Sequence, residues 1–284
     1  MSKKRRFFII LIVLVTLLIV FFNYENNSIM TSEINIRSNK VPHNFDGFRI
    51  VHLSDLHSKA FGKNQSGVIQ KVKELNPDLI VFTGDLVDQK NYDEKPSLDL
   101  MQESVKISPV YFVTGNHERF SGKFSSLEEK LRGLGVNVMR NTHESIQIGQ
   151  EEIHILGIDD PSMGNESITE YSAAEEAIKN SLQGIKKEGS FKILLSHRPE
   201  LFSLYTQFDM DLILSGHAHG GQFRIPFIGG VIAPNQGFFP QYTSGKYKMN
   251  HSSMIVSRGI GNSVIPQRVL NRPEIISITL SPLN

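Results

Sequence analysis

The feature that most constrains the fold is a set of short apolar runs, several of which stop at Ser, Thr or Gly just before a side chain able to bind a metal. Runs of β-branched residues and leucine of this length are typical of strands covered on both faces. Amphipathic stretches alternate with them, so the sequence predicts an α/β protein. The predicted strands are Phe48–Leu53, Leu79–Phe82, Val110–Val113, Ile153–Ile158, Lys192–Leu195, Leu212–Leu214, Ser253–Val256 and Glu274–Leu280, and the predicted helices are Gly62–Leu75, Ser97–Lys106, Ser125–Leu134 and Ile168–Leu182.

Five of the predicted strands lead directly into Asp, Asn or His residues. Such side chains converge at the carboxyl ends of strands in open α/β sheets, and the small residue before each lets the chain turn closely around a common centre. Turn chemistry alone explains any one of these short motifs, but the whole set in this order predicts a metal site. The predicted ligands are Asp55, His57, Asp85, Asn116, His197, His217 and His219.

Composition excludes several other kinds of site. The 284 residues contain no cysteine, which rules out disulfides, thiolate nucleophiles and cysteine-ligated zinc. The net charge is +1, from 30 Lys and Arg against 29 Asp and Glu, but four of the cations are Lys3, Lys4, Arg5 and Arg6. The remainder carries 26 cations against the same 29 anions, so about −3. We therefore expect no nucleic-acid partner.

The N-terminus predicts a membrane anchor. Phe7 to Phe22 contain one polar residue, Thr16, and would span ~24 Å as a helix, a little short of a ~30 Å hydrocarbon core. No convincing cleavage site follows, so we expect an uncleaved signal anchor in residues 1–30, a polar tether in 31–46 and one domain in 47–284. The four cations before the span predict a single-pass protein of the cell membrane with its domain on the extracytoplasmic side. Arg5 and Arg6 also fit loosely a twin-arginine export signal.

The motifs "DLH", "GDLVD", "GNHE", "SH" and "GHAH" resemble, complete and in order, those of the calcineurin-like metallophosphoesterases. The resemblance covers the chain from about Phe48 to its end and looks closest to the membrane-anchored bacterial branch, whose members carry "GHxHGGQ" and a late "SRGxG". Ala218 replaces the threonine usual between the last two histidines, at a position that is not a ligand. The resemblance implies a central β-sandwich flanked by helices.

The resemblance also implies a mechanism. Asp55, His57 and His219 would bind one metal ion and Asn116, His197 and His217 a second, with Asp85 bridging the two. Donors of oxygen and nitrogen suit Mn, Fe or Zn. A metal-activated hydroxide would then hydrolyse a phosphoester. His117 matches the histidine that stabilises charge or protonates the leaving oxygen, and Asp88 matches the carboxylate that orients it.

Two alternatives to this enzyme stay open: a non-catalytic, membrane-anchored binding or scaffold protein of the same fold, and a nuclease of the superfamily. For the enzyme, the substrate is predicted from the residues after Asp211, where six cations accompany one acid and several phenylalanines. This pattern predicts a lipid-linked or envelope-associated phosphodiester or pyrophosphate. The predicted substrate contacts are Arg258, Arg268 and Phe227, with Phe238 as a further membrane or acyl contact.

Overall fold

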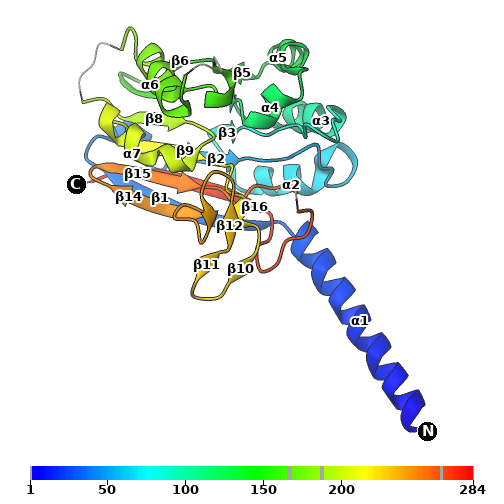
Figure 1. Ribbon diagram of the computed structural model, residues 1–284. Coiled ribbons are helices and arrows are strands. Elements are labelled where there is room, and N and C mark those ends of the chain that lie inside the picture. Colours follow the sequence, from blue (N-terminus) through cyan, green and yellow to red (C-terminus); the bar gives the residue numbers. More distant parts are fainter. Residues whose placement is uncertain (1, 165–167, 186–188, 263–264, 284) are drawn as a thin grey trace.

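A computed structural model describes residues 2–164, 168–185, 189–262 and 265–283. Two six-stranded mixed sheets pack face to face, with helices on their outer faces (Figure 1). The first sheet has the order β1 (Met30–Ser38), β16 (Glu274–Pro282), β2 (Arg49–Leu53), β3 (Leu79–Thr83), β4 (Val110–Val113) and β5 (Asn137–Val138). The second has the order β14 (Gly245–Met249), β15 (Ser252–Val256), β9 (Leu212–Ser215), β8 (Lys192–Leu195), β7 (Glu151–Gly157) and β6 (Thr142–Ile148).

Short helices connect the strands and cover the two outer faces. All eight predicted strands and all four predicted helices are present, with ends shifted by a few residues. The helices are α1 (Lys3–Asn27), α2 (Ser66–Glu74), α3 (Lys95–Ser104), α4 (Asn116–Phe120), α5 (Phe124–Gly133), α6 (Glu170–Ser181) and α7 (Phe202–Tyr205), and the 3-10 turns are η1 (His43–Phe45), η2 (Lys63–Gln65), η3 (Pro161–Met163), η4 (Pro199–Leu201), η5 (Thr206–Phe208) and η6 (His219–Gly221).

Alternation along the strands divides the core into three layers. In β3, Leu79 and Val81 join the cluster between the sheets, whereas Ile80 and Phe82 join the cluster beneath α2, α3 and α5. In β9, Ile213 faces a third cluster beneath α6 and α7. Strands buried on both faces show these continuous apolar runs. The predicted β-sandwich flanked by helices is confirmed.

The predicted tether is wrong for most of its length. Residues 30–38 form β1, which pairs in parallel with β16 along all nine residues. The sequence "TSEINIRS" alternates polar and apolar residues, and Ile34 and Ile36 point toward the core between the sheets. An edge strand with one exposed face therefore looks as polar as a tether. Only Ser28 and Ile29 separate α1 from β1.

Helix α1 leaves the domain as a straight projection (Figure 1). Within the described residues it is the one helix long and apolar enough to cross a membrane, which is weak support for an anchor. It continues beyond the apolar run, through the polar residues "NYENN", to Asn27. Glu25 in this last turn is only 5% exposed, because the helix end packs on the domain.

The Gly- and Pro-rich segment after η6 forms two small hairpins. They pair β10 (Arg224–Ile225) with β11 (Gly229–Gly230), and β12 (Ile232–Ala233) with β13 (Gly237–Phe238). The hairpins project from the same side of the domain as α1 (Figure 1).

Candidate metal centre

The seven predicted metal ligands lie in loops that follow five strands. Asp55 and His57 follow β2, Asp85 follows β3, and Asn116 follows β4 in the first sheet. In the second sheet, His197 follows β8, while His217 and His219 follow β9. The carboxyl ends of these strands meet at one edge of the sandwich, which is how residues up to 164 positions apart come together.

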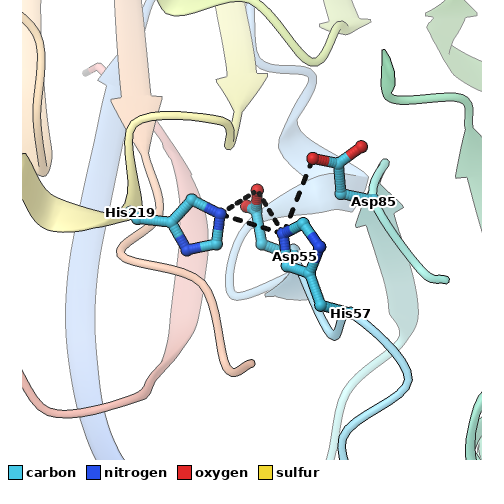
Figure 2. A group of neighbouring side chains, drawn as sticks. All are labelled: Asp55, His57, Asp85 and His219. Carbon is cyan, nitrogen blue, oxygen red and sulfur yellow. Dashed lines mark hydrogen bonds and ion pairs between the residues drawn. The ribbon is translucent and has the colours of Figure 1, made fainter. Parts of the chain in front are cut away.

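Four of these side chains form one group. The donor atoms of Asp55, His57, Asp85 and His219 all lie within 4.8 Å of one another. The Nε2 atoms of His57 and His219 are 2.9 Å apart, and His219 Nε2 is 3.3 Å from Asp55 Oδ1. Figure 2 shows the four side chains turned toward a common point. Two ligand atoms about 2.1 Å from one cation lie roughly 3 to 3.5 Å apart, so the spacing fits a metal ion.

A second group shares Asp85 with the first. His197 Nε2 lies 3.2 Å from Asp85 Oδ2 and also 3.2 Å from His217 Nδ1. Asn116 Oδ1 is buried and has no hydrogen-bond partner within the described residues. Its side chain lines a cavity of about 330 Å³ together with Asp85, His217 and His219, which we call the metal cavity. A buried amide oxygen without a partner is costly, and a cation would satisfy it. The residues therefore fit two metal ions.

The charges of the site are balanced around Asp85. Burial raises the pKa of a carboxyl group, but His197 and His57 outweigh this and hold the pKa of Asp85 well below its usual value. Burial lowers the pKa of His197, yet Asp85 and Asp55 raise it to about 10. Without cations the carboxylates therefore retain a proton on His197, and metal binding at this site would release it.

The backbone around the ligands is strained. The backbone angle φ lies between 47° and 64° at five of the predicted ligands, a region that residues other than glycine rarely adopt. These ligands are Asp55, His57, Asp85, His217 and His219. The position before His217 requires glycine, because a Cβ on Gly216 would lie 2.4 Å from Asp55 Oδ2 and 1.9 Å from Ser54 Oγ. The glycines of "GHAHGGQF" thus let this loop approach the carboxylate at the centre.

Glu118 supports the backbone at Asp85, the predicted bridging residue, and was not itself predicted. Its buried carboxylate accepts hydrogen bonds from the amides of Asp85 and Gly115 at 2.8 and 2.6 Å, and from those of Leu86 and Val87. Burial and the nearby Asp85 raise the pKa of Glu118 to about 7. The sequence signal was the glutamate of "GNHE", which stands three residues after Gly115, but nothing local shows which amides it binds.

His117 and Asp88 lie beside the first group. The His117 ring packs edge-on to that of His57, with 4.4 Å between centroids, and lines the cavity. The amide of Gln89 donates to His117 Nδ1 at 3.2 Å, so Nδ1 carries no proton and Nε2 is the donor of the neutral ring. Asp88 Oδ2 lies 3.6 Å from His117 Nδ1 and 3.7 Å from His57 Nδ1, between the two rings.

The predicted substrate contacts do not gather at the metal ligands. Arg268 is 1% exposed, and its guanidinium donates to the carbonyls of Arg258, Gly259, Gly261 and Asn271, so it is not available to a phosphate. Net charge cannot distinguish such a buried guanidinium from a surface cation. Arg258 is partly exposed and lies 3.8 Å from Glu274. Phe227 is fully exposed at the tip of the β10–β11 hairpin.

The end of α1 contacts the loop behind His219. We call residues 22–28 together with residues 265–272 the anchor junction. Glu25 Oε2 accepts from the amide of Asn271 at 2.9 Å, and Asn271 Nδ2 donates to the carbonyl of His219 at 2.7 Å. Asn26 Oδ1 accepts from the amide of Arg268 at 2.8 Å. A short chain of hydrogen bonds therefore connects the anchor to a predicted metal ligand.

Comparisons with known proteins agree with this geometry. The sequence model of a family described as calcineurin-like phosphoesterase matches residues 48–221, more than half of the chain. The uncharacterized metallophosphoesterase YkuE of Bacillus subtilis is 32% identical over 265 residues, which cover 92% of this chain and 88% of that protein. The phosphodiesterase YaeI of Escherichia coli is 27% identical over 238 residues, 82% of each chain. A transmembrane protein with metallophosphoesterase domain from Danio rerio is 30% identical over 257 residues, 87% of this chain and 56% of that one.

Proposed function

Because the chain belongs to the calcineurin-like phosphoesterase family, we propose that it is a binuclear metal-dependent hydrolase of phosphodiesters or pyrophosphates. The observation that carries this proposal is the position of Asp85, whose carboxylate belongs to both groups of donor atoms. A shared carboxylate is what two cations about 3.5–4 Å apart require.

Each group of side chains would hold one cation. Asp55, His57 and His219 hold the first, and Asn116, His197 and His217 the second, with Asp85 between them. When bound, two such cations polarise the phosphoryl oxygens and lower the pKa of a coordinated water to ~7, which supplies the nucleophile. The set of nitrogen and oxygen donors suits Mn, Fe or Zn.

His117 acts on the substrate rather than on a cation. Its Nδ1 is occupied by the amide of Gln89, so its Nε2–H is the group that can donate into the cavity. There it hydrogen-bonds a phosphoryl or leaving oxygen as negative charge develops. Asp88 accepts from the amides of Lys90 and Asn91 and stands beside the ring, where it holds a compensating negative charge.

We further propose that the substrate is linked to a lipid or to the cell envelope. Helix α1 is the anchor, its positive flank stays in the cytoplasm, and the domain faces the extracytoplasmic side. Phe227 and Phe238 are 109% and 74% exposed, on hairpins that project beside the anchor (Figure 1). Exposed aromatic side chains beside an anchor favour contact with a membrane. Arg258 stays a prediction from the sequence, because it does not line the metal cavity.

The test of the proposed function uses the full-length protein in lipid nanodiscs. Loaded with Mn²⁺ or Zn²⁺, it is expected to retain about two cations per chain and to hydrolyse methyl p-nitrophenyl phosphate. Asp85→Asn serves as the negative control. Binding of two cations with no hydrolysis of any phosphodiester would favour the non-catalytic scaffold protein, and activity confined to nucleic acids would favour a nuclease.

The topology is tested separately. Since the chain contains no cysteine, Ser126→Cys, at an exposed position, places a single thiol on the domain. A maleimide that cannot cross membranes should label it in intact cells, while Ser2→Cys on the other flank of α1 should react only after lysis. The reverse pattern would contradict the proposed orientation.

A further inference from the structure

A second cavity adjoins the metal centre. It has a volume of about 270 Å³, and its lining includes His219 and Pro234, which also line the metal cavity. The rest of its wall is almost entirely apolar and comes from Ala218, Ile232, Ala233 and Ile265. We call this space the apolar cavity. It is slightly smaller than typical ligand pockets, which span about 300–1,000 Å³, and so has room for part of a ligand.

The chemistry of the wall excludes a polar occupant. Apart from His219, the polar side chain in the wall of the apolar cavity is that of Gln222. Its Nε2 already donates to the carbonyls of Ile265 and Gln267. A polar ligand would therefore lose its hydrogen bonds to water without replacement, whereas a hydrocarbon would gain by burial.

The apolar cavity lies next to the parts of the chain that face a membrane. Ile232 belongs to β12, which pairs with β13, where Phe238 is exposed. Ile265 belongs to the anchor junction and is 40% exposed. The cavity thus has the metal centre on one side, and the hairpins and the end of α1 on the others.

We propose that the apolar cavity binds the first carbons of the hydrocarbon chain of a lipid phosphoester whose phosphate occupies the metal centre. This proposal rests on the proposed function and adds how the phosphate of the substrate is joined to its lipid. The hydrocarbon chain must begin close to the phosphate, so that the two groups can occupy neighbouring cavities. Water attacks phosphorus, the bond from phosphorus to the leaving oxygen breaks, and the chain stays with one product.

A series of alkyl p-nitrophenyl phosphates tests the proposal. Each is cleaved to p-nitrophenolate and an alkyl phosphate, and the chain grows from methyl to pentyl below the concentration at which micelles form. Each buried methylene strengthens binding about fourfold. In nanodiscs, kcat/KM is therefore expected to rise by about two-hundredfold over the four added methylenes and to level off once the cavity is full.

Variants separate the apolar cavity from partition into the bilayer. Ile265→Asp puts a charge on the wall and should reduce the pentyl-to-methyl ratio of kcat/KM at least tenfold. The conservative variant Ile265→Val should keep most of the wild-type ratio. Leu283→Asp is the matched control, an exposed aliphatic residue directly after β16 that does not line the cavity. It should keep the wild-type ratio.

Three outcomes are distinguishable. No hydrolysis of the methyl ester refutes the proposed function itself. Hydrolysis with a flat chain-length series refutes the apolar cavity as a hydrocarbon site and leaves the enzyme intact. A rising series that Ile265→Asp leaves unchanged assigns the effect to the bilayer and also overturns the proposal.

Discussion

Loss of the hydrogen bonds at the anchor junction is expected to lower both the stability of the domain and its metal content. The perturbation is the double variant Glu25→Ala, Asn26→Ala in the full-length chain. It removes the bond from Asn271 N to Glu25 at 2.9 Å and three bonds of the Asn26 side chain, to Arg268 N at 2.8 Å, Pro266 O at 3.0 Å and Gln267 Nε2 at 3.1 Å.

The magnitude follows from those four hydrogen bonds. A typical hydrogen bond contributes about 1 kcal/mol to stability, and one to a buried carboxylate about 1.5–3 kcal/mol. The sum is about 4.5–6 kcal/mol, a large share of the ~5–15 kcal/mol that holds a domain folded. At roughly 2 °C per kcal/mol for a protein of this size, Tm falls by about 9–12 °C.

The assay combines thermal unfolding followed by circular dichroism with metal content after dialysis, both in nanodiscs. Metal content should fall too, because Asn271 then loses the bond that orients it against the carbonyl of His219. Asn23→Ala is the control, since Asn23 is an exposed residue of the same helix. A double variant with the Tm and metal content of Asn23→Ala would refute the idea that the helix end supports the centre.

Three further predictions concern Asp85, His117 and the two exposed phenylalanines. Asp85→Asn should lower the occupancy of both cations, measured by elemental analysis, because its carboxylate is common to both groups; loss of only one would contradict the bridge. His117→Ala should keep both cations and lower kcat by roughly 10²–10⁴-fold; an emptied site would make His117 a ligand. Phe227→Ser with Phe238→Ser should lower turnover of a lipid phosphodiester in vesicles much more than that of the methyl ester, whereas equal losses would place these side chains in the fold.

Features that depend on the local sequence could be predicted, and features that depend on tertiary contacts could not. The strands before Asp55 and Asp85 were predictable because short, continuous apolar runs indicate buried strands in a protein of this composition. Strand β1 was not, because the alternation around Ile34 and Ile36 is short and one face is polar. The burial of Arg268 depends on backbone carbonyls of a loop whose path only the fold determines.

The same limit applies to the role of the anchor. The sequence placed the polar residues "NYENN" in the predicted anchor, after its apolar run, yet Glu25 and Asn26 bind residues about 240 positions away. Polar residues just after a membrane span are normally explained by the interface alone. Only their burial and partners show that they belong to the domain.

In the proposed topology, the anchor junction also sets how far the candidate metal centre stands from the bilayer. The apolar run of α1 would span ~24 Å, less than a ~30 Å hydrocarbon core, so we expect the membrane surface close to the junction. Tyr24 is 51% exposed there, with the guanidinium of Arg272 5.0 Å from its ring centroid, a pairing suited to the headgroup layer. Since only two residues lie between α1 and β1, the domain cannot move far from the end of α1. The proposed lipid-linked substrate would therefore reach the centre from the leaflet next to the junction, whereas a distant soluble substrate would gain nothing from this arrangement.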